Sequence, residues 1–334
     1  MSILILGRKG SGKSSLLKIL SQGKINIKPF DTNIYAVPKE DYRLFELAKI
    51  FQSKTITPIH LDFIDFPGNA IFSEKNPQLM TNFYKSSLIF YIIPEFLEDK
   101  NPLEEIKEVE NFLILNDLEL CERYLKDKKI DIAERTLIEK IYQLLMEERV
   151  LSSLALDTKE IKILTSLNYI SLKPIFYLIN VSQKTLENKC KIKNINDSLI
   201  NKNFIIYSSI LEEEILDFED KDALEYLSMF DLKDRLIKRI NEKIFQFFNW
   251  ITFFTGNEKE VKAWKLKDGS TVLEAANTIH TDMAKGFIRA EVIPWDKLVN
   301  AGSWKKAQQN GLIILEKKDY IVKDGDVIQI RFHL

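Results

Sequence analysis

Short runs rich in apolar residues recur along most of the chain, and each stops at a glycine, a proline or a polar position. They cover residues 2–6, 59–65, 88–93, 174–180 and 204–208. Runs of this length and composition are typical of buried strands in a parallel sheet. Segments with helical spacing separate them, so we predict an α/β fold with a doubly wound sheet.

A different pattern fills the interval between the third and fourth runs. From Pro102 to about Thr165 there is no glycine and no further proline, and apolar residues recur at spacings of three, four or seven. A charged stretch at 126–129 interrupts the stripe, which then resumes and continues to Leu151. We predict an inserted antiparallel helical hairpin over residues 99–165, whose stripe is a packing seam rather than a groove for a partner.

The composition changes again near Phe247. Beyond it, short strand-like runs alternate with turn signals at 267–269, 310–311 and 324–326, and residues 327–332 alternate as a half-buried strand does. We predict a small β-rich, β-grasp-like domain over residues 249–334. Residues 1–98 and 166–248 then form the sheet domain.

Composition narrows the functional classes. The chain has 334 residues, with 48 Lys and Arg against 49 Asp and Glu, which argues against a globally basic nucleic-acid binder. Its two cysteines, Cys121 and Cys190, form no CxxC pair, so neither a disulfide framework nor a zinc site is indicated. No apolar run approaches the roughly 20 residues that span a bilayer. We expect a cytoplasmic protein without a membrane partner.

The first apolar run leads into the sequence GRKGSGKSS at residues 7–15. Gly7, Gly12, Lys13 and Ser14 satisfy the pattern G-x-x-x-x-G-K-[ST], in which glycines let successive backbone amides point at phosphate oxygens. Lys13 supplies a positive charge for the β and γ phosphates, and the Ser14 hydroxyl coordinates Mg²⁺. Because the pattern lies between a predicted strand and a predicted helix, it predicts a phosphate-binding loop.

Two further segments supply candidate magnesium and γ-phosphate contacts. Asp65 and Gly68 form a D-x-x-G pattern at the end of the second run, as in GTPase-like proteins. There Asp65 would hold Mg²⁺ through a water, and the Gly68 amide would sense the γ-phosphate in catalysis. Thr32 is the candidate switch threonine for the same ion.

The base-side candidates follow the fourth and fifth runs. Residues 180–183 read NVSQ where GTPases carry N-K-x-D, so Asn180 and Gln183 occupy the base-recognising positions. Gln183 is neutral and lacks the charge-assisted bond that an aspartate makes to guanine, which favours adenine. Ser208 and Ser209 match the remaining base-side loop, where a backbone amide would meet the base.

These motifs together resemble the YchF subfamily of the Obg-like ATPases. The resemblance rests on GRKGSGKSS, PFDT, DFPG, NVSQ and SSILEEE, and on C-terminal segments similar to a TGS domain at 252–256, 260–264, 279–282, 285–292 and 320–326. It implies a Mg²⁺-dependent ATPase with three domains that associates with ribosomes. By position, it assigns Val181 to the base. It assigns the phosphates to Gly10, Ser11, Gly12, Lys13, Ser14 and Ser15.

This chain departs from the subfamily pattern in its switch regions. The segment 69–76 is short and lacks glycine, and Gln183 replaces the subfamily's glutamate. One hypothesis is a protein that hydrolyses ATP, or GTP, slowly. Its nucleotide state would change how the hairpin and TGS domain dock on a ribosome or ribosomal subunit. Whether this docking includes contact with RNA is left open. The alternative is a non-hydrolysing, ribosome-associated scaffold, and a third is a GTP-specific switch. We assign no general base, and we expect a monomer.

Overall fold

The computed structural model describes residues 1–23, 33–66, 76–96, 101–127 and 129–333. The chain forms two compact units. The first unit comprises Met1–Val37 and Leu61–Leu236, and the second comprises Pro38–His60 and Ile237–Leu334. No helix within these described ranges is both long enough and apolar enough to cross a membrane.

A six-stranded sheet in the order β2-β4-β1-β5-β6-β7 forms the centre of the first unit. Its strands are β1 (Ser2–Gly7), β2 (Asn33–Pro38), β4 (His60–Asp65), β5 (Leu88–Pro94), β6 (Ile175–Asn180) and β7 (Phe204–Tyr207). The five predicted strands are confirmed, and β1, β4, β5, β6 and β7 pair in parallel. Every residue of β5 and β6 is buried, which explains their continuous apolar runs.

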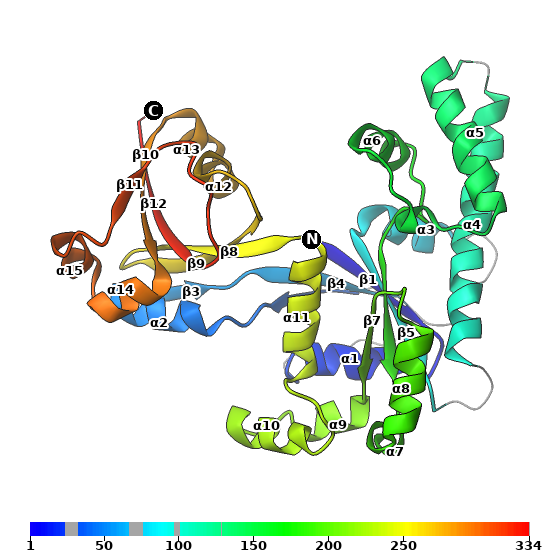
Figure 1. The fold of residues 1–334 in the computed structure, drawn as a ribbon, viewed down its shortest axis with the longest axis horizontal. Coiled ribbons are helices and arrows are strands. Elements are labelled where there is room, and N and C mark those ends of the chain that lie inside the picture. The colour runs from blue at the N-terminus through cyan, green and yellow to red at the C-terminus, as the bar shows by residue number, and fades with distance from the viewer. Residues whose placement is uncertain (24–32, 67–75, 97–100, 128, 334) are drawn as a thin grey trace. The chain divides into compact units, whose positions relative to one another are not determined.

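Helices connect these strands or follow the last of them, as the predicted fold class requires (Figure 1). They are α1 (Lys13–Leu20), α3 (Pro77–Lys85), α7 (Gln183–Glu187), α8 (Lys189–Ser198), α9 (Ser209–Glu214) and α10 (Asp220–Ser228). Helix α11 (Leu236–Phe247) begins at the last residue of the first unit. The architecture is therefore a doubly wound α/β sheet of the P-loop type.

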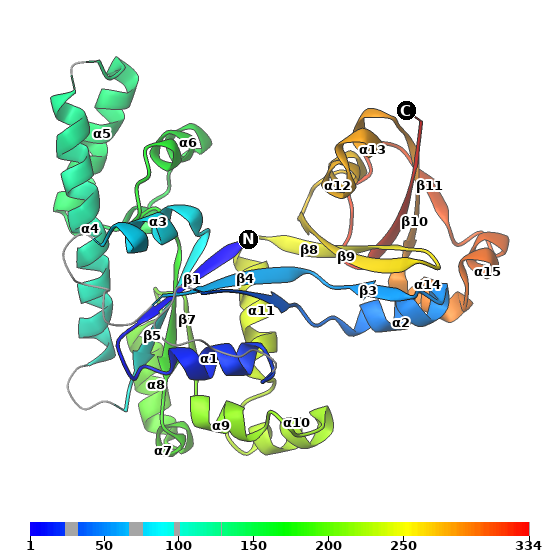
Figure 2. The same cartoon turned by 180° about the vertical axis from the view of Figure 1, so that it is seen from behind.

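Between β5 and β6 the chain forms the helical insertion, which we define as residues 101–171. Helix α4 (Pro102–Lys126) starts where Asn101 caps it and proline occupies its first turn, a sequence-encoded start signal. Its first half packs on the sheet through Ile106 and Val109, and its second half packs against α5 (Ile132–Met146). The two helices lie side by side (Figures 1 and 2), as predicted.

The second helix of the pair is shorter than its apolar stripe indicates. Helix α5 ends at Met146, and Glu148 adopts a positive φ of 57°, which no α-helix tolerates. Leu151 lies instead in a 3₁₀ turn, and a third helix, α6 (Thr158–Ser166), follows. Leu151 and the α6 residue Leu164 join the same buried cluster as α5. A 3₁₀ turn and a separate helix therefore supply apolar residues that the stripe predicted for one continuous helix.

The second unit also contains a six-stranded sheet, in the order β11-β10-β12-β8-β9-β3. Its strands are β3 (Thr55–Thr57), β8 (Trp250–Gly256), β9 (Glu260–Lys267), β10 (Phe287–Pro294), β11 (Ile314–Glu316) and β12 (Asp326–Phe332). Short helices accompany them: α12 (Val272–Ile279), α13 (Thr281–Lys285), α14 (Trp295–Ala301) and α15 (Trp304–Gln309). The predicted β-rich C-terminal part is thus confirmed, with more helix than its turn signals show.

One strand and one helix of the second unit come from early in the sequence. Residues 38–60, which the sequence analysis places in the sheet domain, form α2 (Tyr42–Phe51) and β3. Strand β3 pairs in parallel with β9, and Leu47 and Phe51 of α2 join a buried cluster with Phe254. The apolar periodicity of α2 marks a buried face, but it does not show which core receives that face.

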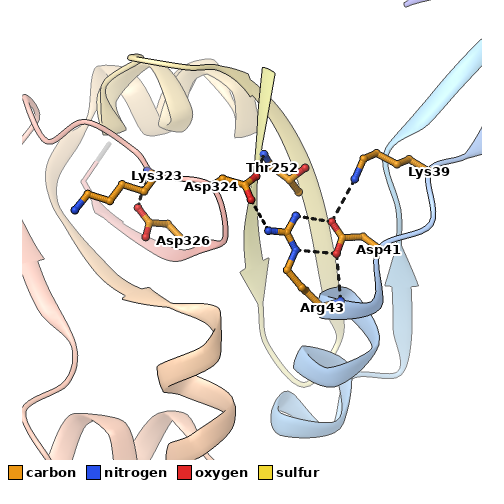
Figure 3. A network of polar contacts seen from close by, with 7 residues as sticks. All are labelled: Lys39, Asp41, Arg43, Thr252, Lys323, Asp324 and Asp326. Carbon is orange, nitrogen blue, oxygen red and sulfur yellow. Dashed lines mark hydrogen bonds and ion pairs between the residues drawn. The ribbon is translucent and has the colours of Figure 1, made fainter. Parts of the chain in front are cut away.

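A polar network fixes α2 to the C-terminal strands (Figure 3). Asp41 caps α2 and accepts hydrogen bonds from the Arg43 Nε at 2.8 Å and Nη2 at 2.7 Å. Arg43 Nη1 donates to Asp324 Oδ2 at 2.6 Å, and Asp324 Oδ1 accepts from the Thr252 amide at 2.8 Å. One guanidinium thus joins residues 41 and 324 within a single folded unit.

Candidate nucleotide-binding site

The predicted phosphate loop connects β1 to α1. Gly10 and Gly12 adopt φ angles of +81° and +100°, which L side chains rarely reach, so the two glycines allow the loop to curl. Gly12 is the N-cap of α1 and, being glycine, has no side chain with which to cap that helix. Its first backbone amides and its positive end therefore remain for an anion, as the motif predicts.

Lys13 lies in the first turn of α1 and folds back over the loop. Its Nζ donates to the Gly7 carbonyl at 2.8 Å and to the Arg8 carbonyl at 3.1 Å. Burial lowers the pKa of Lys13, and the carboxylate of Asp65 opposes that shift. The ammonium is thus held inside the loop, where phosphate oxygens can replace two backbone carbonyls as its partners.

Asp65 stands at the end of β4, beside Ile5 of the neighbouring strand β1. Burial raises the pKa of the Asp65 carboxyl, and the positive charge of Lys13 opposes that shift. Its Oδ1 is buried and has no hydrogen-bond partner among the described residues. A buried carboxylate oxygen without a partner is a good ligand for a cation or for water bound to one.

These residues fit the magnesium ion that the motif implies. Mg²⁺ prefers oxygen ligands and retains several waters, and Asp65 offers a carboxylate while Ser14 offers an exposed hydroxyl in the first turn of α1. No group of three or more His, Cys, Asp or Glu that could hold a metal occurs among the described residues. The remaining predicted contacts, Thr32 and Gly68, lie outside the described residues.

Asn180 joins the phosphate loop to the base-side loop. Its Nδ2 donates to the Ser11 carbonyl at 3.0 Å and to the Ser209 Oγ at 3.1 Å. Its Oδ1 accepts from the Ser209 amide at 2.9 Å. Asn180 is buried, so these bonds form away from water. The asparagine holds the two loops together at the carboxyl end of β6, where ligands of open α/β sheets bind.

The approach of Asn180 also explains why position 12 is glycine. A Cβ atom placed on Gly12 would lie 2.5 Å from the Asn180 Nδ2, much closer than real Cβ contacts. Among the described residues, a Cβ on Gly10 would meet nothing within 4 Å, so the backbone angles are what call for glycine there. The two glycines of the loop therefore have different structural roles.

The other base-side candidates lie around this asparagine. Val181 is buried, and its amide donates to the Tyr207 carbonyl at 2.8 Å. Gln183 is half-buried in the first turn of α7, and Ser208 is buried directly before α9. The hydroxyls of Ser11 and Ser208 are buried without a hydrogen-bond partner in the part of the chain that the structure describes. The structure gives Ser15, in α1, a half-buried position.

Sequence reasoning missed Arg8, a variable position of the loop motif. Its Nη2 donates to Glu108 Oε2 of α4 at 2.5 Å, and its Nε lies 3.2 Å from Glu105 Oε1. Nothing in the motif fixes the residue type at this position, and the two carboxylates follow it by about a hundred residues. The contact is visible only once α4 is placed against the sheet.

Comparisons with known proteins agree with this geometry. The family model YchF-GTPase_C, described as a protein of unknown function (DUF933), matches residues 250–333. The chain is 31% identical to the Ribosome-binding ATPase YchF of Haemophilus influenzae, over 99% of this chain and 98% of that one. It is 29% identical to the protein of the same name from Escherichia coli O157:H7, over the same shares.

The fold likewise matches a solved structure. The Schizosaccharomyces pombe YchF GTPase superposes with a TM-score of 0.80 at 22% identity, covering 99% of this chain and 97% of that one. This likeness establishes the fold, and the sequence matches over nearly the full length establish descent. The chain therefore belongs to the YchF family.

Proposed function

We propose that this protein is a Mg²⁺-dependent P-loop NTPase that hydrolyses ATP slowly, with GTP as a second substrate. The observation that carries the proposal is the contact of Asn180 with the Ser11 carbonyl, which assembles the phosphate and base loops into one site. Relatives over almost the whole chain are named ribosome-binding ATPases. For the domains, we propose a nucleotide-binding part at residues 1–98 and 166–248, a helical hairpin at 99–165 and a TGS domain at 249–334, except that residues 38–60 and 237–248 group with the C-terminal unit.

Lys13 and the loop amides would carry the chemistry. The Lys13 ammonium would leave the Gly7 and Arg8 carbonyls and neutralise charge on the transferring phosphoryl group, while the amides of residues 10–15 hold the phosphates. When bound, Mg²⁺ neutralises charge on the β and γ phosphate oxygens. Asp65 and Ser14 would orient that ion through their oxygens. Gly68 and Thr32 are proposed to complete the site.

Gln183 supports the choice of ATP. A glutamine both donates and accepts, so it can face an adenine edge without the net charge that favours guanine. We place Val181, Gln183, Ser208 and Ser209 on the base side of the site. A clear preference for GTP in competition would exclude this assignment.

The nucleotide state is proposed to control association with ribosomes. The partner is inferred from relatives that are named ribosome-binding ATPases. The helical insertion and the C-terminal unit are the surfaces through which this chain would contact it. On this account the protein acts as a monomer in the cytoplasm. RNA contact through the C-terminal unit is part of the same proposal.

Single-turnover hydrolysis distinguishes the proposed enzyme from the alternative, a non-hydrolysing scaffold. Enzyme in excess over labelled ATP should release phosphate at a rate that Lys13→Ala reduces at least tenfold, because one charge-assisted contact to the transferring group is lost. Lys18→Ala, an exposed change on the same helix, should leave the rate within twofold. Nucleotide binding without Lys13-dependent release of phosphate would favour a nucleotide-gated scaffold. Ribosome pelleting with and without nucleotide then tests whether the ribosome is the partner.

A further inference from the structure

Arg8 forms a bridge from the phosphate loop to the helical insertion. The residue follows the last residue of β1, while both of its acidic partners, Glu105 and Glu108, lie in the first two turns of α4. Glu108 Oε2 accepts from Arg8 Nη2 at 2.5 Å, and Glu105 Oε1 lies 3.2 Å from Nε. A single guanidinium thus forms ion pairs with two carboxylates on one helix.

The inner half of this bridge is buried. The Glu105 side chain is only 5% exposed, whereas the Glu108 side chain is 40% exposed. Tyr91 of β5 donates from its hydroxyl to Glu105 Oε1 at 2.9 Å. Burial and the nearby Glu105 raise the pKa of Tyr91, so the phenol stays protonated and donates. Because a buried carboxylate needs compensating charge and hydrogen bonds, the start of α4 depends on Arg8.

The backbone of Arg8 takes part in the phosphate loop itself. Its carbonyl accepts the Ser11 amide at 3.1 Å and the Lys13 Nζ at 3.1 Å. The residue therefore contacts the loop through its main chain and α4 through its side chain. A phosphate that binds Lys13 competes with the Arg8 carbonyl for the same ammonium, so ligand binding acts directly on the residue that holds α4.

We propose that Arg8 is a positioning residue that couples nucleotide binding to the helical insertion through Glu105 and Glu108. The ion pairs fix Arg8 and pre-organise the loop for phosphate, and bound nucleotide in turn strengthens the attachment of α4, as linkage requires. This inference rests on the proposed function, because it concerns the same nucleotide site. On this inference, the helical insertion regulates the nucleotide site.

Hydrogen exchange on the full chain tests the coupling directly. Saturating Mg²⁺ and a non-hydrolysable ATP analogue should slow amide exchange at residues 102–113 by at least threefold. Arg8→Met should remove most of that slowing at saturating analogue. Unchanged exchange at 102–113 in a chain that demonstrably binds the analogue would overturn the coupling and leave the proposed function intact. Failure of the unchanged chain to bind the analogue would refute both.

A double-mutant cycle separates coupling from general damage to the loop. Glu108→Gln lies outside the loop and should weaken analogue binding about two- to fivefold, the range of a partly exposed ion pair. In the Arg8→Met background the same change should have no effect on analogue binding, because the Arg8–Glu108 pair that carries the coupling is already gone. Glu104→Gln, an exposed carboxylate one turn away, should leave affinity unchanged in both backgrounds. Equal effects of Glu108→Gln in both backgrounds, or no effect in either, would overturn the proposal.

Discussion

The side-chain amide of Asn180 donates to the backbone carbonyl of Ser11 at 3.0 Å, across 169 positions of sequence. This bond joins the end of β6 to the phosphate loop, and the same side chain holds the Ser209 amide. One buried asparagine therefore sets the distance between the proposed phosphate-binding part of the site and the proposed base-binding part.

Removing this side chain should loosen both loops. Asn180→Ala leaves the Ser11 carbonyl and the Ser209 amide without a buried partner, which costs roughly 1–3 kcal/mol for each group. We expect amide exchange in α1 and α9 to accelerate and analogue affinity to fall at least tenfold. Asn196→Ala, at an exposed position of α8, is the matched control. Equal behaviour of the two variants would show that the asparagine does not hold the site together.

Substitutions of the two loop glycines should differ in severity. Gly10→Ala introduces the strain of a positive φ, about 1 kcal/mol, and its Cβ would meet none of the residues that the structure describes within 4 Å. Gly12→Ala adds a clash with the Asn180 Nδ2. We expect Gly12→Ala to abolish nucleotide binding and Gly10→Ala to weaken it about fivefold, as measured by calorimetry. A milder effect at Gly12 than at Gly10 would contradict the described loop.

Residues 38–60 should determine the stability of the C-terminal unit. The Arg43 side chain is 14% exposed and pairs with Asp41 and Asp324. Arg43→Met removes both pairs and should lower the free energy of unfolding by about 3 kcal/mol. All four tryptophans belong to the second unit, so fluorescence during urea denaturation reports its unfolding. Lys49→Met, which removes an exposed pair on the same helix, should cost at most about 0.5 kcal/mol. A C-terminal fragment that begins at residue 237 should not fold alone.

Stability should depend on pH through Asp117 of α4. This carboxylate accepts the Ile170 amide at 2.9 Å and the Ser171 amide at 2.8 Å, and burial raises its pKa to about 6 while those amides oppose the shift. Because the folded pKa lies above the unfolded value near 3.8, the native state binds the proton more tightly. The contribution is therefore complete below pH 4 and disappears as the pH rises through 6.

Urea denaturation followed by circular dichroism between pH 4 and 7 measures how the contribution of Asp117 to the free energy of unfolding changes with pH. The free energy of unfolding of the wild type, relative to Asp117→Asn, should fall with rising pH by up to about 3 kcal/mol. Asp197→Asn, at an exposed position of α8, supplies the background dependence to be subtracted. A difference between wild type and Asp117→Asn that stays constant over this range would refute the assignment.

The phosphate loop and the five parallel strands were predictable because their signals are local. Glycine spacing encodes the loop angles at Gly10 and Gly12, and buried strands show as continuous apolar runs. The start of α4 is likewise encoded locally, because Asn101 caps the helix and Pro102 is its first residue. In each case a few neighbouring residues determine the conformation.

Other features depend on contacts that no local pattern contains. The apolar face of α2 is visible in the sequence, yet its burial with Phe254 requires the tertiary fold. Helix α5 ends because Glu148 adopts a left-handed angle, although the apolar stripe continues beyond it. Arg8 carries no motif signal at all, and its role follows from the placement of two glutamates on α4.

Equilibrium titration tests most directly whether the loop at residues 7–15 binds nucleotide. Non-hydrolysable ATP and GTP analogues are titrated in Mg²⁺ into the wild type and into Lys13→Ala. We expect saturable binding that is tighter for the ATP analogue and at least tenfold weaker in Lys13→Ala, because a charge-assisted phosphate contact is lost. Absence of binding to the wild type, or equal affinity in both proteins, would contradict this expectation.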